Sequence, residues 1–477
     1  MNKLVISRSH WEKSKAHLLK MNGEHFVFFL CGVAKFNDDG VSFFVRDVIP
    51  IQDTDIQQAK GKGLQLSLEV LLRITNRARK EGLALVEAHS HPWVKTSVRF
   101  TKTDLDGLKE FVPYILDDLP SEPYAATVWG QESVDGLCWR SSTKNQIPLE
   151  EVRIVGENIT RIITTSRLKK LRTRSKDGLD DRASRQVLMI GAQGQEHVRQ
   201  TKVAVVGLGG LGSQVVQMLT YLGVRNFVLV DFDKVEAINL NRLVGAEPKD
   251  LGKSKVDIAE RMIKRILCTS NRPVQKFETD LRDERVLNAL KKTDVIFGCV
   301  DRDGPRLILN ELSLAYMIPY IDCAFGINAE NDLIREAGGR VILVKPEGPC
   351  LICCKEIDIR AASDDLAPQE EFEERARQGY VTGMDVSSPS VISLDGTVAS
   401  LAVTEFLALV TGFRPTRTYT FYDMLEQRVV PRLVEPDPKC VACTVRGIGD
   451  KASIERYAQT HVPKDIPQIQ RHTANQS

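Results

Sequence analysis

Two cysteine pairs are the residues in this sequence whose type and spacing most plainly suit a metal ion. They are Cys350-x-x-Cys353 and Cys440-x-x-Cys443, about 90 residues apart. Both thiols of a Cys-x-x-Cys turn can face one tetrahedral ion, and two such turns complete a closed site. The separation is too wide for a free-standing zinc ribbon. We therefore predict a structural Zn²⁺ site that fastens the C-terminal end to a larger core; four buried thiols without metal are the alternative.

A histidine pair suits a different metal chemistry. The segment LVEAHSHPW contains His89 and His91, and FTKTD supplies Thr101 and Asp104. Histidines one residue apart on a strand point to the same side, so they can share one ion with a carboxylate. Three protein ligands plus water are typical of a catalytic zinc site. An isolated His-x-His is usually incidental, and a zinc-binding protein without activity is a further alternative.

A glycine-rich loop follows an apolar strand in the second half of the chain. The run VAVV leads into GLGGLG at residues 207–212 and then into an apolar helix, and Asp231 ends the next strand. Glycines let the backbone approach a phosphate at the positive end of a helix, and a carboxylate about 20 residues later usually binds ribose. By itself this pattern fits a nicotinamide dehydrogenase equally well.

The residues after the loop favour ATP over a nicotinamide cofactor. Asn239 and Arg242 lie in NLNR, Lys255 follows GKS, and Asp301 follows a later strand in CVDRD. A site that cuts a triphosphate needs cations for the phosphates and a carboxylate for Mg²⁺. The predicted nucleotide-binding residues are Gly207, Gly209, Gly210, Gly212, Asp231, Asp233, Asn239, Arg242, Lys255 and Asp301.

GLGGLGS, LVDFD, NLNR, GKSK, CVDRD and the two cysteine pairs together resemble the ubiquitin-activating (ThiF/MoeB-like) family over residues 183–443. The resemblance implies that ATP is used to adenylate the C-terminal glycine of a ubiquitin-like protein, with release of pyrophosphate. By the match of SRQVLMIGAQGQE to the family's entry helix, Arg185 is an arginine that contacts the triphosphate across a homodimer interface. The same resemblance assigns the ribose to Asp231, the phosphates to Arg242 and Lys255, and magnesium to Asp301.

One family feature is missing. Members that form a thioester or persulfide have a nucleophilic cysteine between the two zinc-binding turns, and the stretch from Lys355 to Lys439 contains none. The serine and threonine hydroxyls in that stretch are poor substitutes for the cysteine nucleophile, because a hydroxyl is barely ionised at neutral pH. A thioester step in this chain is therefore in doubt. The resemblance also leaves open a conjugating enzyme as the partner that accepts the activated tail.

HSHP followed by T-x-x-D resembles the JAMM motif of the JAB/MPN metalloproteases over residues 1–148. Such enzymes cleave the peptide or isopeptide bond after a ubiquitin-like modifier. The resemblance implies a catalytic Zn²⁺ on the two histidines and Asp104, with Thr101 in the position of a serine that supports the tetrahedral intermediate. Glu24, at the start of EHFVFFLCG, is the expected general base; Glu87 is expected to support the site instead.

The elements that must position these residues are two α/β units. Strands, a helix, another strand and a helix are expected in residues 1–148, and a mostly parallel, doubly wound, Rossmann-like sheet in residues 183–443. Residues 149–182 are strongly basic in part and predict a solvated linker. Residues 444–477 predict a C-terminal tail that is partly disordered.

Composition limits the class of protein. The chain has 477 residues with 42% hydrophobic and 27% charged residues and a net charge of +2. These values are typical of a soluble globular protein and do not favour specific binding to nucleic acid or to a membrane. No apolar stretch approaches the 18 residues of a membrane span. The ten cysteines and the lack of a signal-type start predict a cytoplasmic protein.

Taken together, the motifs predict an enzyme with two activities in a bacterial ubiquitin-like modification pathway: zinc-dependent cleavage after a modifier tail, and ATP-dependent adenylation of that tail. Two alternatives stay open. One is an adaptor without catalysis, or an enzyme with only one working site, that binds ubiquitin-like proteins. The other is a nicotinamide dehydrogenase with structural zinc.

Overall fold

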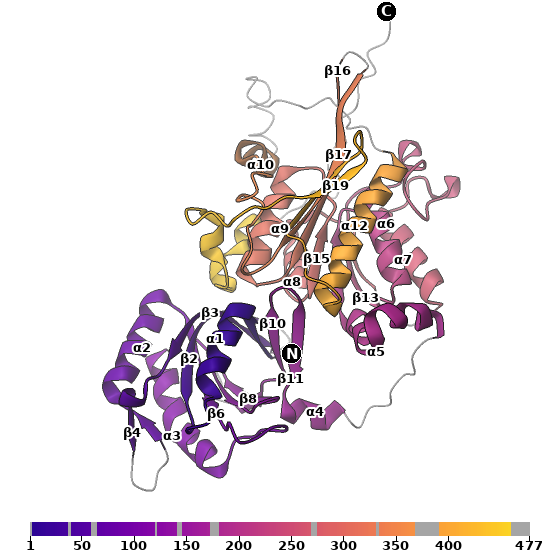
Figure 1. Ribbon diagram of the computed structural model, residues 1–477. Helices are drawn as coiled ribbons and strands as arrows, with labels where there is room; N and C mark the ends of the chain where they lie inside the picture. Colours follow the sequence, from indigo (N-terminus) through magenta and orange to yellow (C-terminus); the bar gives the residue numbers. More distant parts are fainter. Residues whose placement is uncertain are drawn as a thin grey trace, which may run out of the picture.

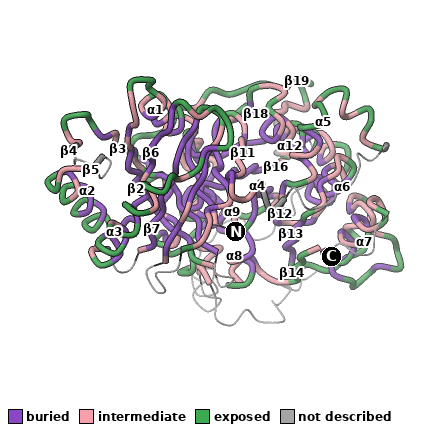
Figure 2. The backbone as a smooth tube through the Cα atoms, turned by 90° about the horizontal axis from the view of Figure 1, so that it is seen from below, coloured by how far each residue is buried: buried purple, intermediate pink, exposed green. Residues whose placement is uncertain are grey.

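The computed structural model describes residues 2–36, 40–58, 64–119, 122–140, 146–171, 181–268, 274–330, 333–367 and 391–458. Two β-sheets, each covered by helices, form two bodies that lie against each other (Figure 1). The buried strands run through the middle of both bodies, and exposed helices such as α2 and α7 lie at the periphery (Figure 2). The predicted mixed α/β fold with a Rossmann-like sheet is confirmed.

The N-terminal body is a nine-stranded sheet in the order β11-β10-β1-β3-β2-β6-β7-β8-β9. Its strands are β1 (Lys3–Ser7), β2 (Phe26–Lys35), β3 (Val41–Pro50), β6 (Ala84–Ser90), β7 (Tyr124–Trp129), β8 (Val134–Trp139), β9 (Gln146–Pro148), β10 (Glu151–Val155) and β11 (Ile159–Ile163), with a separate pair β4 (Ile56–Gln58) and β5 (Leu64–Leu66). Its helices are α1 (Arg8–Leu18), α2 (Leu68–Glu81), α3 (Lys102–Asp118) and α4 (Thr165–Leu171).

Alternation of side chains along the strands builds two cores, one on each face of this sheet. On β2, Val27 and Phe29 belong to the core that includes Trp11 of α1, whereas Phe28 and Leu30 belong to the core under α2 and α3. Successive strand residues point to opposite faces, so one apolar run serves both cores. The five elements predicted in residues 1–148 are present as β2, β3, α2, β6 and α3.

The predicted linker over 149–182 is wrong for its first part. β10 pairs in parallel with β1, and β11 pairs antiparallel with β10, so residues up to Ile163 belong to the N-terminal sheet. The run EVRIV is fully buried in this arrangement. Its partner strand lies almost 150 residues earlier in the chain, so no local pattern indicated the pairing. The basic stretch at 172–180 lies outside the described residues.

The second body is an eight-stranded sheet in the order β14-β13-β12-β15-β16-β17-β18-β19. Its strands are β12 (Lys202–Val206), β13 (Asn226–Val230), β14 (Gln275–Phe277), β15 (Val295–Gly298), β16 (Tyr320–Glu330), β17 (Leu333–Val344), β18 (Tyr419–Asp423) and β19 (Arg428–Pro431). Its helices are α5 (Ser184–Gln200), α6 (Gly210–Tyr221), α7 (Lys255–Leu267), α8 (Glu284–Leu290), α9 (Asp303–Ala315), α10 (Ile359–Leu366) and α12 (Ile392–Thr411).

The pairing of this sheet changes along its width. The strands from β14 to β16 are parallel, and those from β16 to β19 are antiparallel. Helix α12 is long and apolar enough to cross a membrane by length and composition, but 56% of its most apolar window is buried inside the protein. It packs on α6, β16 and β17. A core helix of a globular protein accounts for its composition.

The described part of the predicted tail is ordered and joins the two bodies. It forms the short helices η5 (Ala442–Val445), η6 (Asp450–Ala452) and η7 (Ile454–Tyr457). Gly449 forms a bridge with Val33 of β2, and the Lys35 backbone N–H donates to Asp450 Oδ2 at 2.9 Å. The first part of the predicted partly disordered tail, residues 444–458, is therefore ordered against the N-terminal body, and residues 459–477 lie outside the described part.

Candidate metal and nucleotide sites

The two histidines and Asp104 meet where β6 ends and α3 begins. His89 Nε2 lies 3.5 Å and His91 Nε2 3.4 Å from Asp104 Oδ2. One ligand atom from each of the three residues lies within 4.8 Å of the others. Helix α3 places the carboxylate through a capping box, since Thr101 Oγ1 accepts from the Asp104 N–H at 3.2 Å and the Thr101 N–H donates to Asp104 Oδ2 at 2.6 Å.

The chemistry of this donor set fits zinc. Both histidines are only 3% exposed, and Nε2 of each has no hydrogen-bond partner among the described residues. Unpartnered buried polar atoms are rare, and a metal ion is one of the partners that satisfies them. Burial lowers the pKa of His89, but the Asp104 and Glu87 carboxylates outweigh it and raise that pKa to about 9. The three residues together therefore attract a cation.

The two glutamates lie on different sides of the histidine pair. Glu24 Oε1 is 3.6 Å from His91 Nε2, and burial raises the Glu24 pKa. Glu87 Oε1 is 3.7 Å from His89 Nδ1, and its other oxygen accepts from the Tyr124 hydroxyl at 2.7 Å. Glu24 lies just before β2, not within it, and the pairing of Phe26 with His89 brings it to the site.

Thr101 and Trp93 complete the surroundings of the histidines. Thr101 is exposed, and its hydroxyl accepts the helix-capping bond, which leaves its proton available to donate. Trp93, which the sequence analysis did not single out, stacks on His91 with ring centroids 5.6 Å apart and is 60% exposed. In the sequence, Trp93 directly follows the His-x-His-Pro motif, and this position could have identified it as a neighbour of the histidines.

The four predicted thiols lie together on the second body. Cys350 Sγ is 3.7 Å from Cys353 Sγ and 3.6 Å from Cys440 Sγ, and Cys353 Sγ is 3.7 Å from Cys443 Sγ. A tetrahedral ion with Zn–S bonds of about 2.3 Å needs sulfurs roughly 3.8 Å apart. A hydrogen bond from the Cys443 thiol lowers the pKa of Cys350 to about 5. The donor set and its spacing therefore fit a structural zinc ion.

The glycine loop lies at the carboxyl end of β12, at the start of α6. Gly207 has φ +86°, and a Cβ there would lie 2.4 Å from the Cys299 carbonyl oxygen. A Cβ on Gly212 would lie 1.9 Å from the Gly207 carbonyl oxygen, whereas a Cβ on Gly209 would meet nothing within 4 Å. Two of the glycines are thus required by close backbone contacts, and Gly209 stands where a ligand can approach.

The loop lies at the switch point of the sheet. Chain order runs from β12 to β13 and β14 on one side and returns to β15 on the other side. Asp231 follows β13 and Asp301 follows β15, so both lie at the same edge as the loop. Ligands of open α/β sheets bind in the crevice that forms at such a switch point. Asp301 is exposed there.

Among the predicted nucleotide residues, Asp231, Asp233 and Lys255 form hydrogen bonds within the chain. Asp231 accepts from the Leu208 N–H at 2.5 Å and from the Asp233 N–H at 2.8 Å, and burial raises its pKa. Lys255 Nζ donates to Asp233 Oδ2 at 2.6 Å and is 8% exposed. Asp231 therefore holds the glycine loop in place, and Asp233 holds the Lys255 ammonium near the strand end.

Arg242 and Asn239 lie on the segment after β13. Arg242 Nη1 donates to the Ile238 carbonyl at 2.6 Å, and its Cδ lies 3.1 Å from the position of a Cβ on Gly210. Asn239 Oδ1 accepts from the Glu236 N–H at 3.2 Å, which caps η3 (Ala237–Asn239). Arg242 thus lies beside the glycine loop, while the Asn239 side chain has a local structural bond.

Arg185 lies far from the glycine loop of its own chain. It is exposed in the first turn of α5, and the adjacent Gln186 side chain donates to the Tyr221 carbonyl at the C-terminal end of α6. The loop lies at the N-terminal end of α6, roughly 16 Å away for a 12-residue helix. Within one chain the structure does not bring Arg185 to the phosphate loop.

Asp395 is a residue of this site that the sequence analysis missed. It is 3% exposed in the first turn of α12, and its Oδ2 would lie 2.2 Å from a Cβ on Gly210. A buried carboxylate is expensive unless it has polar partners, which marks this contact as a specific feature of the loop. The signal was the charged Asp395, followed by Gly396, in the first turn of a mostly apolar helix.

The ThiF family model matches residues 183–443, which is more than half of the 477-residue chain and includes the glycine loop and all four clustered cysteines. The chain belongs to the ThiF family. Among relatives, the SAMP-activating enzyme E1 of Haloferax volcanii is 29% identical over 283 residues, which cover 58% of this chain and 92% of that protein.

Two further similar proteins are less identical in sequence to this ThiF-family chain. Ubiquitin-like modifier-activating enzyme 5 of Gallus gallus is 25% identical over 274 residues, and the match spans 64% of that protein, less than two thirds of its length. The solved structure of E. coli MccB with succinimide is 18% identical, covers 55% of this chain and 74% of its own, and has a TM-score of 0.44.

Proposed function

We propose that this ThiF-family chain uses ATP and Mg²⁺ to adenylate the C-terminal glycine of a ubiquitin-like protein. The observation that supports this most is the grouping of the glycine loop, Asp231 and Asp301 at one switch point inside the family region. The relative from Haloferax volcanii is a SAMP-activating enzyme E1, and the relative from Gallus gallus is a ubiquitin-like modifier-activating enzyme. A dehydrogenase has no need for the cations beside this loop.

In the proposed reaction, backbone N–H groups at the start of α6 bind the phosphates, and Arg242 beside the loop adds a cation. Lys255 would exchange its bond to Asp233 for a phosphate oxygen. Asp301 would hold Mg²⁺, which neutralises charge on the phosphates. An oxygen of the tail carboxylate bonds to the α-phosphorus, the bond from that phosphorus to its bridging oxygen breaks, and pyrophosphate leaves.

The position of Arg185 supports a homodimer as the active unit. Its own glycine loop is at the other end of α6, and the neighbouring Leu188 and Met189 on α5 are 88% and 61% exposed. A second copy that covered this apolar surface would bring Arg185 to the partner's loop. The guanidinium would then stabilise the charge of the triphosphate in trans.

We also propose that the N-terminal body is a JAB/MPN-type zinc peptidase that cleaves after a ubiquitin-like tail. The observation that supports it is the convergence of the two histidines, Asp104 and Glu24. Zinc held by the first three would lower the pKa of its bound water toward about 7. Glu24 would accept the water proton and deliver it to the leaving amine, while Glu87 keeps His89 oriented.

We also propose that both activities take place in the cytoplasm. All ten cysteines are free thiols, which supports a reducing compartment such as the cytoplasm. Because the sequence between the zinc-binding turns has no cysteine, we infer that the adenylated tail passes to a separate conjugating enzyme. An adaptor without catalysis is the competing hypothesis.

ATP–pyrophosphate exchange tests the adenylation proposal, with small proteins ending in glycine as substrates. Asp301→Ala should abolish exchange while the circular dichroism spectrum stays unchanged, because Asp301 is exposed. Asp257→Ala, a change of an exposed carboxylate on α7, should leave exchange intact. Wild-type exchange by Asp301→Ala would contradict the proposal, and NADH binding without ATP binding would support a dehydrogenase.

A mixture of Arg185→Ala and Asp301→Ala proteins tests the homodimer. Partial recovery of ATP–pyrophosphate exchange in this mixture is the result expected of a homodimer.

A further inference from the structure

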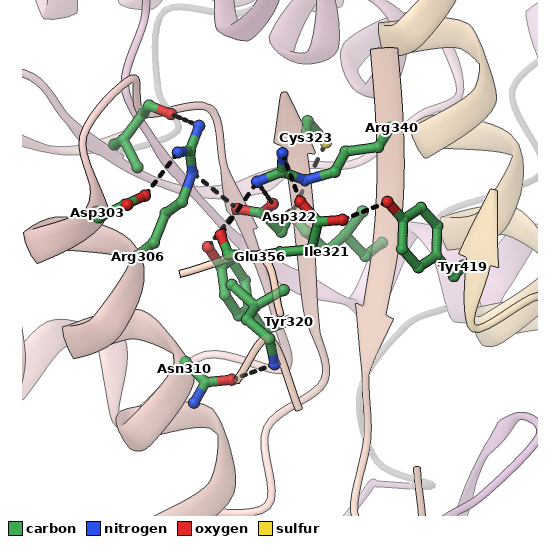
Figure 3. Close-up of polar contacts among 12 residues, drawn as sticks. Asp303, Arg306, Asn310, Tyr320, Ile321, Asp322, Cys323, Arg340, Glu356 and Tyr419 are labelled. Carbon is green, nitrogen blue, oxygen red and sulfur yellow. Dashed lines mark hydrogen bonds and ion pairs between the residues drawn. The ribbon is translucent and has the colours of Figure 1, made fainter. Parts of the chain in front are cut away.

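An ion network centred on the buried Asp322 is shown in Figure 3, and one of its arginines contacts the loop that carries Asp301. It consists of Arg306, Tyr320, Asp322, Arg340 and Glu356, and we call it the Asp322 network. Asp322 is 0% exposed on β16, and the Tyr320 hydroxyl donates to its Oδ1 at 2.8 Å. Arg306 Nε lies 3.6 Å from Oδ1, and Arg340 Nη2 lies 3.5 Å from Oδ2. One carboxylate therefore lies between two guanidinium groups.

Arg306 connects this network to the Asp301 loop. Its Nη2 donates to the Val300 carbonyl at 2.9 Å, and its Nη1 donates to Asp303 Oδ1 at 3.0 Å. These two contacts hold the chain on both sides of Asp301. The other oxygen of Asp303 accepts from the Asp358 N–H at 3.0 Å, which extends the support to the segment after the first cysteine pair.

The burial of Asp322 explains why Arg306 stays in this position. An ionised carboxylate away from water is stable only with charged and hydrogen-bonding partners, so the Asp322 charge binds the Arg306 guanidinium. The guanidinium is planar and presents its donors in a fixed arrangement. With Nε directed at Asp322, its two terminal groups point at the loop. Arg340 and Glu356, joined at 2.8 Å, form the other side of the network, away from the loop.

We propose that Arg306, held by Asp322, is a positioning residue that places Asp301 to receive the magnesium ion of the bound nucleotide. The inference rests on the proposed adenylation and adds a residue to it. Asp301 itself has no regular secondary structure around it, because it lies in a bend between β15 and α9. Residues that orient a metal ligand typically change metal affinity by 10–100-fold when they are altered.

The test measures Mg²⁺ dependence directly, without turnover. Radiolabelled ATP bound to the full chain is measured by equilibrium dialysis while Mg²⁺ is varied. Arg306→Lys keeps the charge and loses the fixed arrangement of donors, so the Mg²⁺ concentration for half-maximal binding should rise on the order of 10-fold. Asp322→Asn should raise the Mg²⁺ concentration for half-maximal binding as well. This second variant tests the inference if Arg306→Lys does not fold. ATP binding without Mg²⁺ should stay unchanged in both.

Glu356→Gln is the matched control. Glu356 is 18% exposed and Arg306 12%, and both belong to the network, but Glu356 contacts Arg340 and Tyr419, not the loop. This variant should unfold at a lower urea concentration with unchanged Mg²⁺ dependence. An unchanged Mg²⁺ midpoint in Arg306→Lys, or equal shifts in Arg306→Lys and Glu356→Gln, would overturn the inference. Wild-type protein that binds ATP with no Mg²⁺ dependence would overturn the adenylation proposal, and this inference with it.

Discussion

At the scale of single residues, the two glutamates near the histidine pair have similar chemistry and different surroundings. Glu24 faces Nε2 of His91, the atom directed at the proposed metal, and is half-buried. Glu87 faces Nδ1 of His89, on the opposite side of that ring, and is bonded to Tyr124. A general base needs access to the metal-bound water, whereas an orienting carboxylate needs only the second nitrogen of the ring.

Replacing each glutamate by glutamine should therefore give different defects. Glu24→Gln should keep zinc and lose cleavage of a modifier with a C-terminal extension by about 10² or more, since the proton acceptor is gone. Glu87→Gln should weaken zinc binding by roughly 10–100-fold and regain cleavage when zinc is added. Zinc content and cleavage are measured on the same samples. If Glu24→Gln cleaves normally and Glu87→Gln has no activity even with added zinc, the two roles are reversed.

At the scale of elements, one of the contacts between the start of α6 and α12 is made at a glycine. Gly210 lies against Asp395 of α12 and beside the Arg242 side chain, and the space for a Cβ there is filled. Gly209, one residue earlier, has φ −68° and open space around it. Neighbouring glycines in one loop thus have different reasons for lacking a side chain: Gly210 packs against the protein and Gly209 faces the proposed ligand.

Alanine at these positions should separate stability from nucleotide binding. Gly210→Ala should lower the free energy of unfolding by about 1–3 kcal/mol, because the added methyl group displaces Asp395 or α12. Gly209→Ala should change it by less than about 0.5 kcal/mol and still weaken ATP binding, since its methyl group enters the phosphate position. Urea unfolding and calorimetric ATP titration measure the two effects. Equal stability of the two variants would show that the Asp395 contact is not tight.

At the scale of the whole molecule, a buried ion cluster joins the two bodies. Asp294, just before β15, pairs at 2.7 Å with Arg153 of β10 and at 2.7 Å with Arg161 of β11. Arg153 also pairs with Glu151 at 2.7 Å, and it is 4% exposed. Burial raises the pKa of Asp294, but the two arginines outweigh it and hold that pKa well below its usual range. The described part of the C-terminal segment adds a second join at β2.

Removing the Asp294 charge should lower the free energy of unfolding at neutral pH. The pKa of Asp294 is lower in the folded protein than in the unfolded chain. The contribution of the Asp294 charge to the free energy of unfolding is therefore complete above the unfolded-state pKa of about 4, and it is lost as the pH falls below about 4 toward the folded-state pKa. Asp294→Asn leaves the buried Arg153 with Glu151 as its remaining carboxylate partner and removes the carboxylate that pairs with Arg161, so it should cost about 1–3 kcal/mol at pH 7. The difference from wild type in urea unfolding should shrink below about pH 4. Glu247→Gln, at the exposed pair with Lys249, is the control and should leave the midpoint unchanged. A difference that does not vary with pH would contradict this account.

The sequence alone was sufficient for features that depend on neighbouring residues or on short spacings. The glycine loop, the Cys-x-x-Cys pairs and the His-x-His pair are local patterns, and the structure brings the residues of each together. The apolar runs of β12, β13 and β15 predicted a buried parallel sheet because both of their faces must be covered. The match to the ThiF family over residues 183–443 includes the glycine loop, the cysteine pairs and these three strands.

Tertiary structure alone decided which distant segments meet. It placed β10 beside β1, the segment from 444 to 458 against β2, Asp395 under Gly210, and Asp322 between two arginines. It also separated Arg185 from the glycine loop of its own chain. These partners lie tens to hundreds of residues apart, and their choice follows from the packing of whole sheets and helices. Local propensity and spacing have no information about such packing, because any buried strand or charged side chain has many partners of suitable chemistry in a chain of 477 residues.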